Sequence, residues 1–181
     1  MREYRIFLGS SILEPISYDR FAIGNFVRKI NDALRAHGED IYLYLYLCEL
    51  EDASITPGKM QKKQQEYDDF ICNEADLFLN LYHERVGQFT RQELELARQF
   101  LPPENILVMF RRVAQPHTSV SELQLHLKET GLPYGSYEHI DEIKIVLLQW
   151  LCRQEPELAV CTDAGQLTIG THTVLRTGSL H

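Results

Sequence analysis

The sequence has few of the features that mark a metalloprotein or a disulfide-bonded protein. Its four cysteines are spread over 181 residues, and no two of them have the Cys-x-x-Cys spacing of a zinc or redox site. The seven histidines do not combine with cysteines at metal-ligand spacing either. We therefore expect no metal site. Three cysteines fall within apolar runs, so we expect buried, free thiols in a reducing compartment.

Long apolar runs and a surplus of basic charge are also missing. No stretch reaches the length of a membrane-spanning helix, and "MREYRIFLGS" does not resemble a signal peptide, so we expect a cytoplasmic protein with no membrane partner. The net charge of −8 argues against a broad binding surface for nucleic acid. Basic residues cluster only in "KMQKK" (59–63) and at Arg111–Arg112, where a local anion site stays open.

What the sequence does contain is typical of one folded domain. Hydrophobic residues make up 44% of the chain and charged residues 24%, and a chain of this length can bury a substantial core. Four apolar runs predict buried β-strands at residues 4–9, 41–48, 76–82 and 105–110. Apolar residues at three- and four-residue steps predict helices at residues 19–38, 59–75, 90–101, 119–131 and 137–154.

This alternation of strands and helices predicts an open α/β sheet with helices on both faces, because parallel strands need such crossovers. A short fifth strand, within 111–118 or within 131–136, stays open. After Pro156 the sequence alternates around Asp163–Gly165, which predicts a β-hairpin. We therefore divide the chain into a domain at 1–154 and a tail at 155–181 that is an appendage or the start of another module.

One helix carries a glutamate where an apolar residue is expected. On a helical wheel of residues 93–101, Glu93 lies within the apolar arc and Glu95 on the opposite, solvent-facing side. One interpretation is a capping box, with Thr90 as the N-cap and Glu93 at N3. In the other, Glu93 stands beyond the carboxyl ends of the strands, where open α/β sheets bind their ligands. The two interpretations can coexist.

Other polar residues gather at the predicted strand ends. Ser10 and Ser11 follow Gly9 at the end of the first strand and can contact phosphates or ribose, although an ordinary loop explains them equally well. Glu49 ends the second strand, where acidic residues also serve solubility. Tyr82 ends the third strand, where it can stack on a ligand ring or belong to the core.

The ordered series "RIFLGSS", "DRFAIGNFVRKINDAL", "IYLYLYLCELED", "KKQQEYDDFICNEADLFLNLYHERVGQFTRQELELARQF" and "ILVMFRR" resembles divergent bacterial Toll/interleukin-1 receptor (TIR)-like domains. The resemblance covers residues 4–113 and, more loosely, 137–151. It implies a flavodoxin-like sheet. It also implies that Asp19 and Arg20 line the site, whereas the local sequence explains Asp19 as an N-cap and Arg20 as a solvated side chain.

Enzymatic members of this family cleave NAD⁺ at the nicotinamide–ribose bond with a glutamate early in the third helix. Their Trp-Cys-x-x-Glu-Leu spacing is matched by "FTRQEL" (89–94), with Phe89 for Trp and Thr90 for Cys. The resemblance thus gives Glu93 the catalytic role and places Phe89 at the aromatic wall. No Gly-x-Gly-x-x-Gly occurs, so NAD⁺ is expected as a substrate and no cofactor is expected.

The resemblance implies an effector module of bacterial anti-phage immunity that is activated by self-association, with a partner sensor module. The loop "ELEDASITPGKMQ" (49–61) corresponds to the family's regulatory loop. Two alternatives stay open. One is a non-enzymatic assembly domain, in which Glu93 only caps its helix. The other is a nucleoside deoxyribosyltransferase-like enzyme, which also attacks an N-glycosidic bond with a carboxylate.

Overall fold

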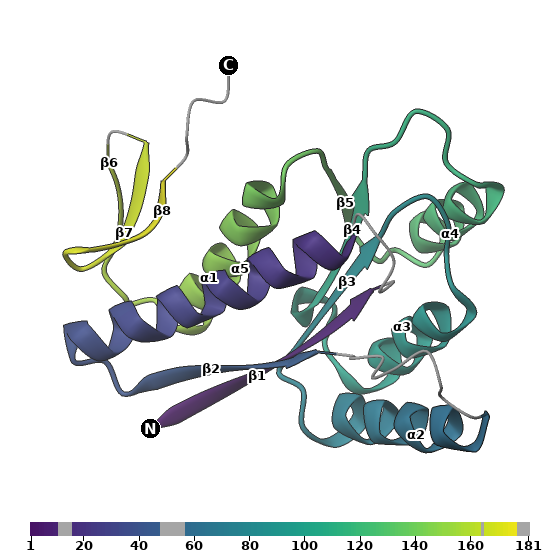
Figure 1. Ribbon diagram of the computed structural model, residues 1–181, viewed down its shortest axis with the longest axis horizontal. Helices are drawn as coiled ribbons and strands as arrows, with labels where there is room; N and C mark the ends of the chain where they lie inside the picture. Colours follow the sequence, from purple (N-terminus) through teal and green to yellow (C-terminus); the bar gives the residue numbers. More distant parts are fainter. Residues whose placement is uncertain (11–15, 48–56, 164, 177–181) are drawn as a thin grey trace.

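The structure, a computed structural model, describes residues 1–10, 16–47, 57–163 and 165–176 (Figure 1). Five parallel strands form the central sheet in the order β2-β1-β3-β4-β5. They are β1 (Arg2–Ser10), β2 (Ile41–Leu47), β3 (Leu77–Tyr82), β4 (Ile106–Arg111) and β5 (Tyr134–Tyr137). The four strands predicted from the sequence are confirmed as parallel neighbours. The fifth strand, left open between two segments, overlaps the second of them.

This strand order is that of a flavodoxin-like fold, as the resemblance implied. The chain moves outward from β1 to β2 and then returns to place β3 on the other side of β1. The order therefore reverses between β1 and β3, and ligands of open α/β sheets bind beyond the carboxyl ends of the strands at such a point.

Helices cover both faces of the sheet (Figure 1). One face is covered by α1 (Ile16–His37) and α5 (Ile140–Gln154). The other is covered by α2 (Pro57–Asn73), α3 (Gln88–Phe100) and α4 (Thr118–Glu129), and a short 3₁₀ turn (Pro103–Asn105) precedes β4. Gly38 ends α1 with a φ of 83°, a left-handed conformation that glycine adopts without steric cost.

The predicted N-cap residues of three helices do not cap these helices in the structure. The N-cap of α3 is Gly87, so Thr90 lies inside the first turn and its hydroxyl donates to the Gly87 carbonyl at 3.1 Å. The predicted capping box of Thr90 and Glu93 is therefore wrong. Asp19 is not an N-cap, because α1 already begins at Ile16.

Ser119 and Glu122 match a capping-box pattern, which predicts Ser119 as the N-cap of α4, but this prediction is also wrong. His117 is the N-cap there, and its ring nitrogen accepts from the Ser119 N–H at 3.2 Å. At this helix start the backbone N–H of Ser119 donates the hydrogen bond, and the side chain of His117 is the cap.

The C-terminal tail forms a three-stranded antiparallel sheet of β6 (Val160–Asp163), β7 (Gln166–Ile169) and β8 (His172–Arg176). The predicted hairpin was incomplete, because a second turn at Gly170, with a φ of 54°, adds β8. This sheet packs beside α1 (Figure 1). Ile169 and Val174 belong to the same buried cluster as α1 and α5.

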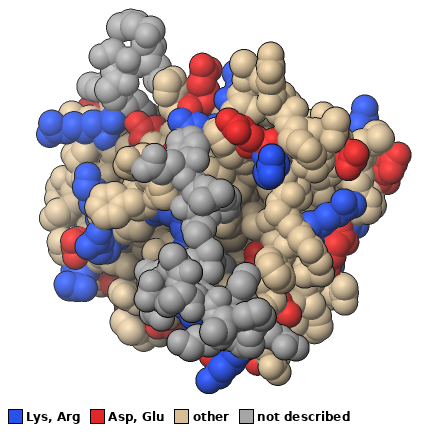
Figure 2. Space-filling view, turned by 45° about the vertical axis from the view of Figure 1, so that its right-hand side comes forward, with Lys and Arg blue, Asp and Glu red and all other residues tan. Residues whose placement is uncertain are grey.

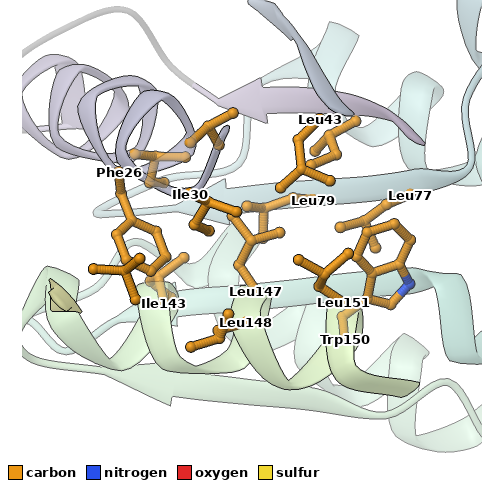
Figure 3. Close-up of a cluster of buried hydrophobic side chains, with 14 of the residues drawn as sticks. Phe26, Ile30, Leu43, Leu77, Leu79, Ile143, Leu147, Leu148, Trp150 and Leu151 are labelled. Carbon is orange, nitrogen blue, oxygen red and sulfur yellow. The ribbon is translucent and has the colours of Figure 1, made fainter. Parts of the chain in front are cut away.

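The two faces of the central sheet have different cores. The α1–α5 face is mainly aliphatic and includes the fully buried Trp150 (Figure 3). The α2–α4 face is rich in aromatic rings, among which Phe7 and Phe78 stack with their centroids 5.4 Å apart. Because side chains alternate along a strand, Asn80 and Tyr82 point to the same face as Phe78.

The described cysteines are free, and their burial differs from the prediction. Cys161 is exposed because it lies on β6, an edge strand of the small sheet. Cys72 and Cys152 are half-buried, and Cys48 lies outside the described residues.

Within the described residues, His, Cys, Asp and Glu side chains nowhere gather in a group that can hold a metal ion. No helix there has the length and apolar character needed to cross a membrane. Basic and acidic side chains are interspersed on the face that Figure 2 shows, in line with the dispersed charge of the sequence.

Candidate functional site

Glu93 lies against the carboxyl ends of β1 and β3 and is 4% exposed. Gly9 of β1 and Asn80 of β3 are direct neighbours in the sheet. A Cβ atom added to Gly9 would lie 3.3 Å from Glu93 Oε2 and 3.3 Å from Asn80 Oδ1. The carboxyl group therefore sits over Gly9, at the point where the strand order reverses. Glycine allows this close approach because it has no side chain.

An amide from α2 joins Glu93 to a second carboxylate. The Gln64 Nε2 group donates to Glu93 Oε1 at 3.3 Å and to Asp68 Oδ1 at 3.0 Å. Neither Gln64 nor Asp68 stood out in the sequence, because their spacing within α2 is that of any polar helix face. Their role follows only from the packing of α2 beside α3.

The surroundings of Glu93 shift its ionisation into the neutral range. Burial raises the pKa of Glu93 from 4.5 to about 7, and the negative charge of Asp68 adds to this increase. The hydrogen bond from Gln64 and the positive charge of Arg20 act in the opposite direction. A carboxyl group with such a pKa, next to the carboxyl ends of the strands, is typical of an active site.

Asn80 and Tyr82 hold the start of α3 against β3. The Asn80 Nδ2 group donates to the Tyr82 hydroxyl oxygen at 2.9 Å and to the Thr90 carbonyl at 3.2 Å. The Tyr82 hydroxyl donates to the same carbonyl at 3.1 Å. Asn80 was missed by the sequence analysis, although a polar residue inside the buried run "LFLNLY" is a signal that can be recognised.

Ser10 and Arg20 meet at the end of β1. Arg20 is 7% exposed and its NH1 group donates to Ser10 Oγ at 3.2 Å. Ser10 directly follows Gly9, over which the Glu93 carboxyl group lies, and the positive charge of Arg20 lowers the pKa of Glu93. The structure therefore brings together Gly9, Ser10, Arg20 and Glu93, and Arg20 is not the solvated side chain of the simpler interpretation.

Asp19 is bound in a network of its own. It is 6% exposed, and its Oδ2 accepts from Arg111 NH1 at 2.9 Å and from the Tyr137 hydroxyl at 2.8 Å. These contacts tie α1 to the ends of β4 and β5.

The two predicted aromatic site residues lie in different environments. Tyr82 is 2% exposed and its ring stacks on Phe110 at 5.1 Å, so it belongs to the core and supports α3. Phe89 is 46% exposed in the first turn of α3. Ser11 and Glu49 lie outside the described residues.

Neither a protein-family model nor a curated protein sequence matches the chain. Among solved structures, the flavodoxin-like domain of a Synechococcus sp. protein is similar at 13% identity and a TM-score of 0.37, covering 82% of this chain and 99% of that one. An oxidoreductase from Corynebacterium diphtheriae is similar at 10% identity and a TM-score of 0.35, covering 83% of this chain and 92% of that one. The flavodoxin-like fold of the chain is defined by its own strand order.

Proposed function

We propose that the protein cleaves NAD⁺ at the nicotinamide–ribose bond and that Glu93 is its catalytic carboxylate. One observation carries the proposal: a buried carboxyl group, with its pKa raised to about 7, lies over Gly9 where the strand order reverses. The resemblance to TIR-like domains gives this residue the same role. The N-cap of α3 also supports the proposal: it is Gly87, so Glu93 does not cap the helix.

The chemistry requires little more than one well-placed anion. The C–N bond breaks with both electrons leaving on nicotinamide, which is already a cationic leaving group and needs no strong general acid. The ribose then carries oxocarbenium character, and a nearby carboxylate stabilises that charge. In hydrolysis a water oxygen forms the new bond to the ribose carbon and releases a proton. An internal nucleophile of the substrate gives a cyclic product in its place.

The residues around Glu93 provide the remaining contacts. The guanidinium group of Arg20 and the hydroxyl group of Ser10 are suited to the negatively charged diphosphate. The exposed ring of Phe89 can stack on a ring of the substrate. In this arrangement NAD⁺ is the substrate and the protein uses no cofactor.

The proposal includes activation by self-association, as in an effector module of bacterial anti-phage immunity with a partner sensor module. Tyr18 and Phe21 support it, because α1 exposes 64% and 67% of these two aromatic residues. Exposed aromatic residues are enriched in protein interfaces. A cytoplasmic location belongs to the same proposal.

The test is product analysis after incubation of concentrated protein with NAD⁺ and several nucleosides. Free nicotinamide supports the proposal, whereas base exchange on a deoxynucleoside indicates a deoxyribosyltransferase. No product in either arm, even at high concentration or with a crowding agent, indicates an assembly domain.

Matched glutamate-to-glutamine variants identify the catalytic residue. Glu93→Gln keeps the size of the side chain and removes its charge, so we expect the rate to fall on the order of a hundredfold or more. Glu95→Gln is the control. Glu95 is not purely solvent-facing as predicted, since it contacts Arg98 and His126, each at 3.1 Å, but these contacts lie at the surface of α3 and α4. Equal loss in both variants would contradict the assignment.

A further inference from the structure

The side-chain carbonyl of Asn80 is the starting point. Asn80 is fully buried, and its Oδ1 has no hydrogen-bond partner within the described part of the chain. The orientation of the amide is fixed, because Nδ2 donates to both the Tyr82 hydroxyl oxygen and the Thr90 carbonyl. A flipped amide would place its oxygen against the Thr90 carbonyl oxygen, and two acceptors repel each other. A buried acceptor without a donor is costly, so this atom calls for an explanation.

Glu93 lies on the same side of Gly9 as this carbonyl. Asn80 Oδ1 and Glu93 Oε2 both lie 3.3 Å from the position of a Cβ atom on Gly9. If Glu93 is ionised, two acceptor oxygens share this buried space with no proton between them. If Glu93 carries its proton on Oε2, its hydroxyl group is a donor beside Asn80 Oδ1, and a hydrogen bond between the two would satisfy both groups.

We propose that Asn80 is a positioning residue: in the empty site its Oδ1 accepts a hydrogen bond from the protonated Glu93 carboxyl group and so holds that group neutral until substrate binds. The catalytic role of this hydrogen bond rests on the proposed function. The hydrogen bond between Glu93 and Asn80 can be tested without that function. The positive charge of the nicotinamide ring of bound NAD⁺ then favours the Glu93 carboxylate. Substrate binding therefore releases the Glu93 proton to solvent and provides the negative charge that the reaction needs.

Charged groups from two neighbouring helices act on the Glu93 carboxyl group, and the two neighbouring strands bring none. Arg20 of α1 favours the anion, and Asp68 of α2 disfavours it. Tyr82 of β3 stays neutral, since burial raises its pKa far above its ordinary value. Gly9 of β1 brings no charge. Asn80 adds a neutral hydrogen-bond acceptor to these influences on the pKa of Glu93. Because Asn80 carries no charge, substituting it leaves the charges of Arg20 and Asp68 in place.

The experiment is an NMR titration of glutamate side-chain carboxyl carbons in the full chain without substrate. The Glu93 signal is identified by its loss in Glu93→Gln. In wild type we expect this signal to titrate near neutral pH and the Asn80 Cγ signal to move with the same midpoint. In Asn80→Leu we expect the pH midpoint of the Glu93 titration to fall by about one unit, because the neutral carboxyl group loses its hydrogen-bond acceptor.

Tyr82→Phe is the matched control. It removes a hydroxyl group from the same cluster and leaves Asn80 Oδ1 in place, so the Glu93 midpoint should stay within a few tenths of a unit. An unchanged midpoint in Asn80→Leu would overturn the proposal and leave Asn80 as a structural residue. If Asn80→Leu does not fold, the wild-type titration decides, because an Asn80 Cγ signal that does not follow Glu93 is equally contradictory. The proton contact can be present in a protein that does not cleave NAD⁺, so the two proposals fail separately.

Discussion

Near the carboxyl ends of the strands, each face of the sheet buries one carboxyl group, and the two groups are held differently. On the α1–α5 face, Asp19 accepts from a guanidinium group, that of Arg111, and from the Tyr137 hydroxyl. On the α2–α4 face, Glu93 accepts from the neutral amide of Gln64, and that amide also donates to the carboxylate of Asp68.

Neutral polar groups show the same contrast. Asn31 on the α1–α5 face is bound on both sides, because its amide donates to the Leu43 carbonyl and its oxygen accepts from the Leu43 N–H, at 2.9 and 2.8 Å. Asn80 on the other face keeps its oxygen without a partner among the described residues. Buried polar groups normally find partners, and the exceptions cluster where function requires them. The α1–α5 face therefore satisfies the hydrogen bonds of Asp19 and Asn31, whereas the α2–α4 face leaves one buried acceptor without a partner among the described residues, beside the candidate site.

The largest expected effect comes from removing the small sheet that covers part of the α1–α5 cluster. Deleting residues 157–181 removes Ile169, Val174 and Leu175, which are buried in the α1–α5 cluster. We expect loss of soluble folded protein, measured as soluble yield and by circular dichroism. Ile169→Ala is the milder form and should cost about 2–4 kcal/mol of unfolding free energy. A deletion variant that melts cooperatively at the wild-type temperature would show that the small sheet is only an appendage.

The next effect is the contribution of Asp19 to the stability of the fold, which should differ in sign from that of Glu93. Asp19→Asn leaves the Arg111 guanidinium without its counter-charge at a mostly buried position. Removing one partner of such a pair should lower the free energy of unfolding by about 3 kcal/mol. Urea denaturation at pH 7 measures this loss. A change below about 0.5 kcal/mol would mean that the α1–α5 face does not depend on this network.

Glu93→Gln should have the opposite sign. The folded-state pKa of Glu93 is about 7 against 4.5 for the unfolded chain, so the folded state binds the extra proton between these values. The stability that this provides is present below pH 4.5 and is lost as the pH rises through 7. At pH 8 a neutral glutamine avoids this loss and can donate to Asn80 Oδ1. We expect a gain of about 2 kcal/mol.

The measurement for this variant is the melting temperature at pH 8 and at pH 4. The gain should be present at pH 8 and nearly absent at pH 4, where the wild-type carboxyl group is already neutral. A lower melting temperature at pH 8 would show that Glu93 stabilises the fold and is not strained by its burial.

The smallest effect concerns the rate, provided that the protein cleaves NAD⁺. Because the anion of Glu93 is the active form, kcat/KM should rise about tenfold from pH 6 to pH 8 and level off above the pKa of about 7. Asp68→Asn removes a charge that raises this pKa, so the half-rise should move to lower pH. A flat profile in this range would exclude Glu93 as the ionising group.

The sequence was a good guide to the main elements. The strands up to Phe110 are apolar runs bounded by loops, and Glu93 stood out as a carboxylate within an apolar arc. β5 was harder to locate, because "YGSY" is four residues long, is interrupted by glycine and buries only Tyr137. The helix starts were misjudged because Thr90 and Ser119 match capping patterns, while the chain geometry begins each helix earlier.

The rest of the site depends on contacts that local sequence does not encode. Gln64 reaches Glu93 across 29 positions of the chain, from α2 to α3, and the register between two packed helices cannot be derived from either helix alone. Asn80 was recognisable as a polar residue in a buried strand, but its partners Tyr82 and Thr90 follow from where α3 begins.

The single tryptophan gives the molecule a built-in optical probe. Trp150 is fully buried, its indole N–H donates to Asn105 Oδ1 at 3.0 Å, and its ring meets Tyr4 edge-on at 5.6 Å. It lies in the buried cluster of the α1–α5 face (Figure 3), whereas Glu93 lies on α3 of the other face. Its fluorescence therefore reports changes in the packing around Trp150, and a ligand that binds at Glu93 without changing the emission leaves that packing intact.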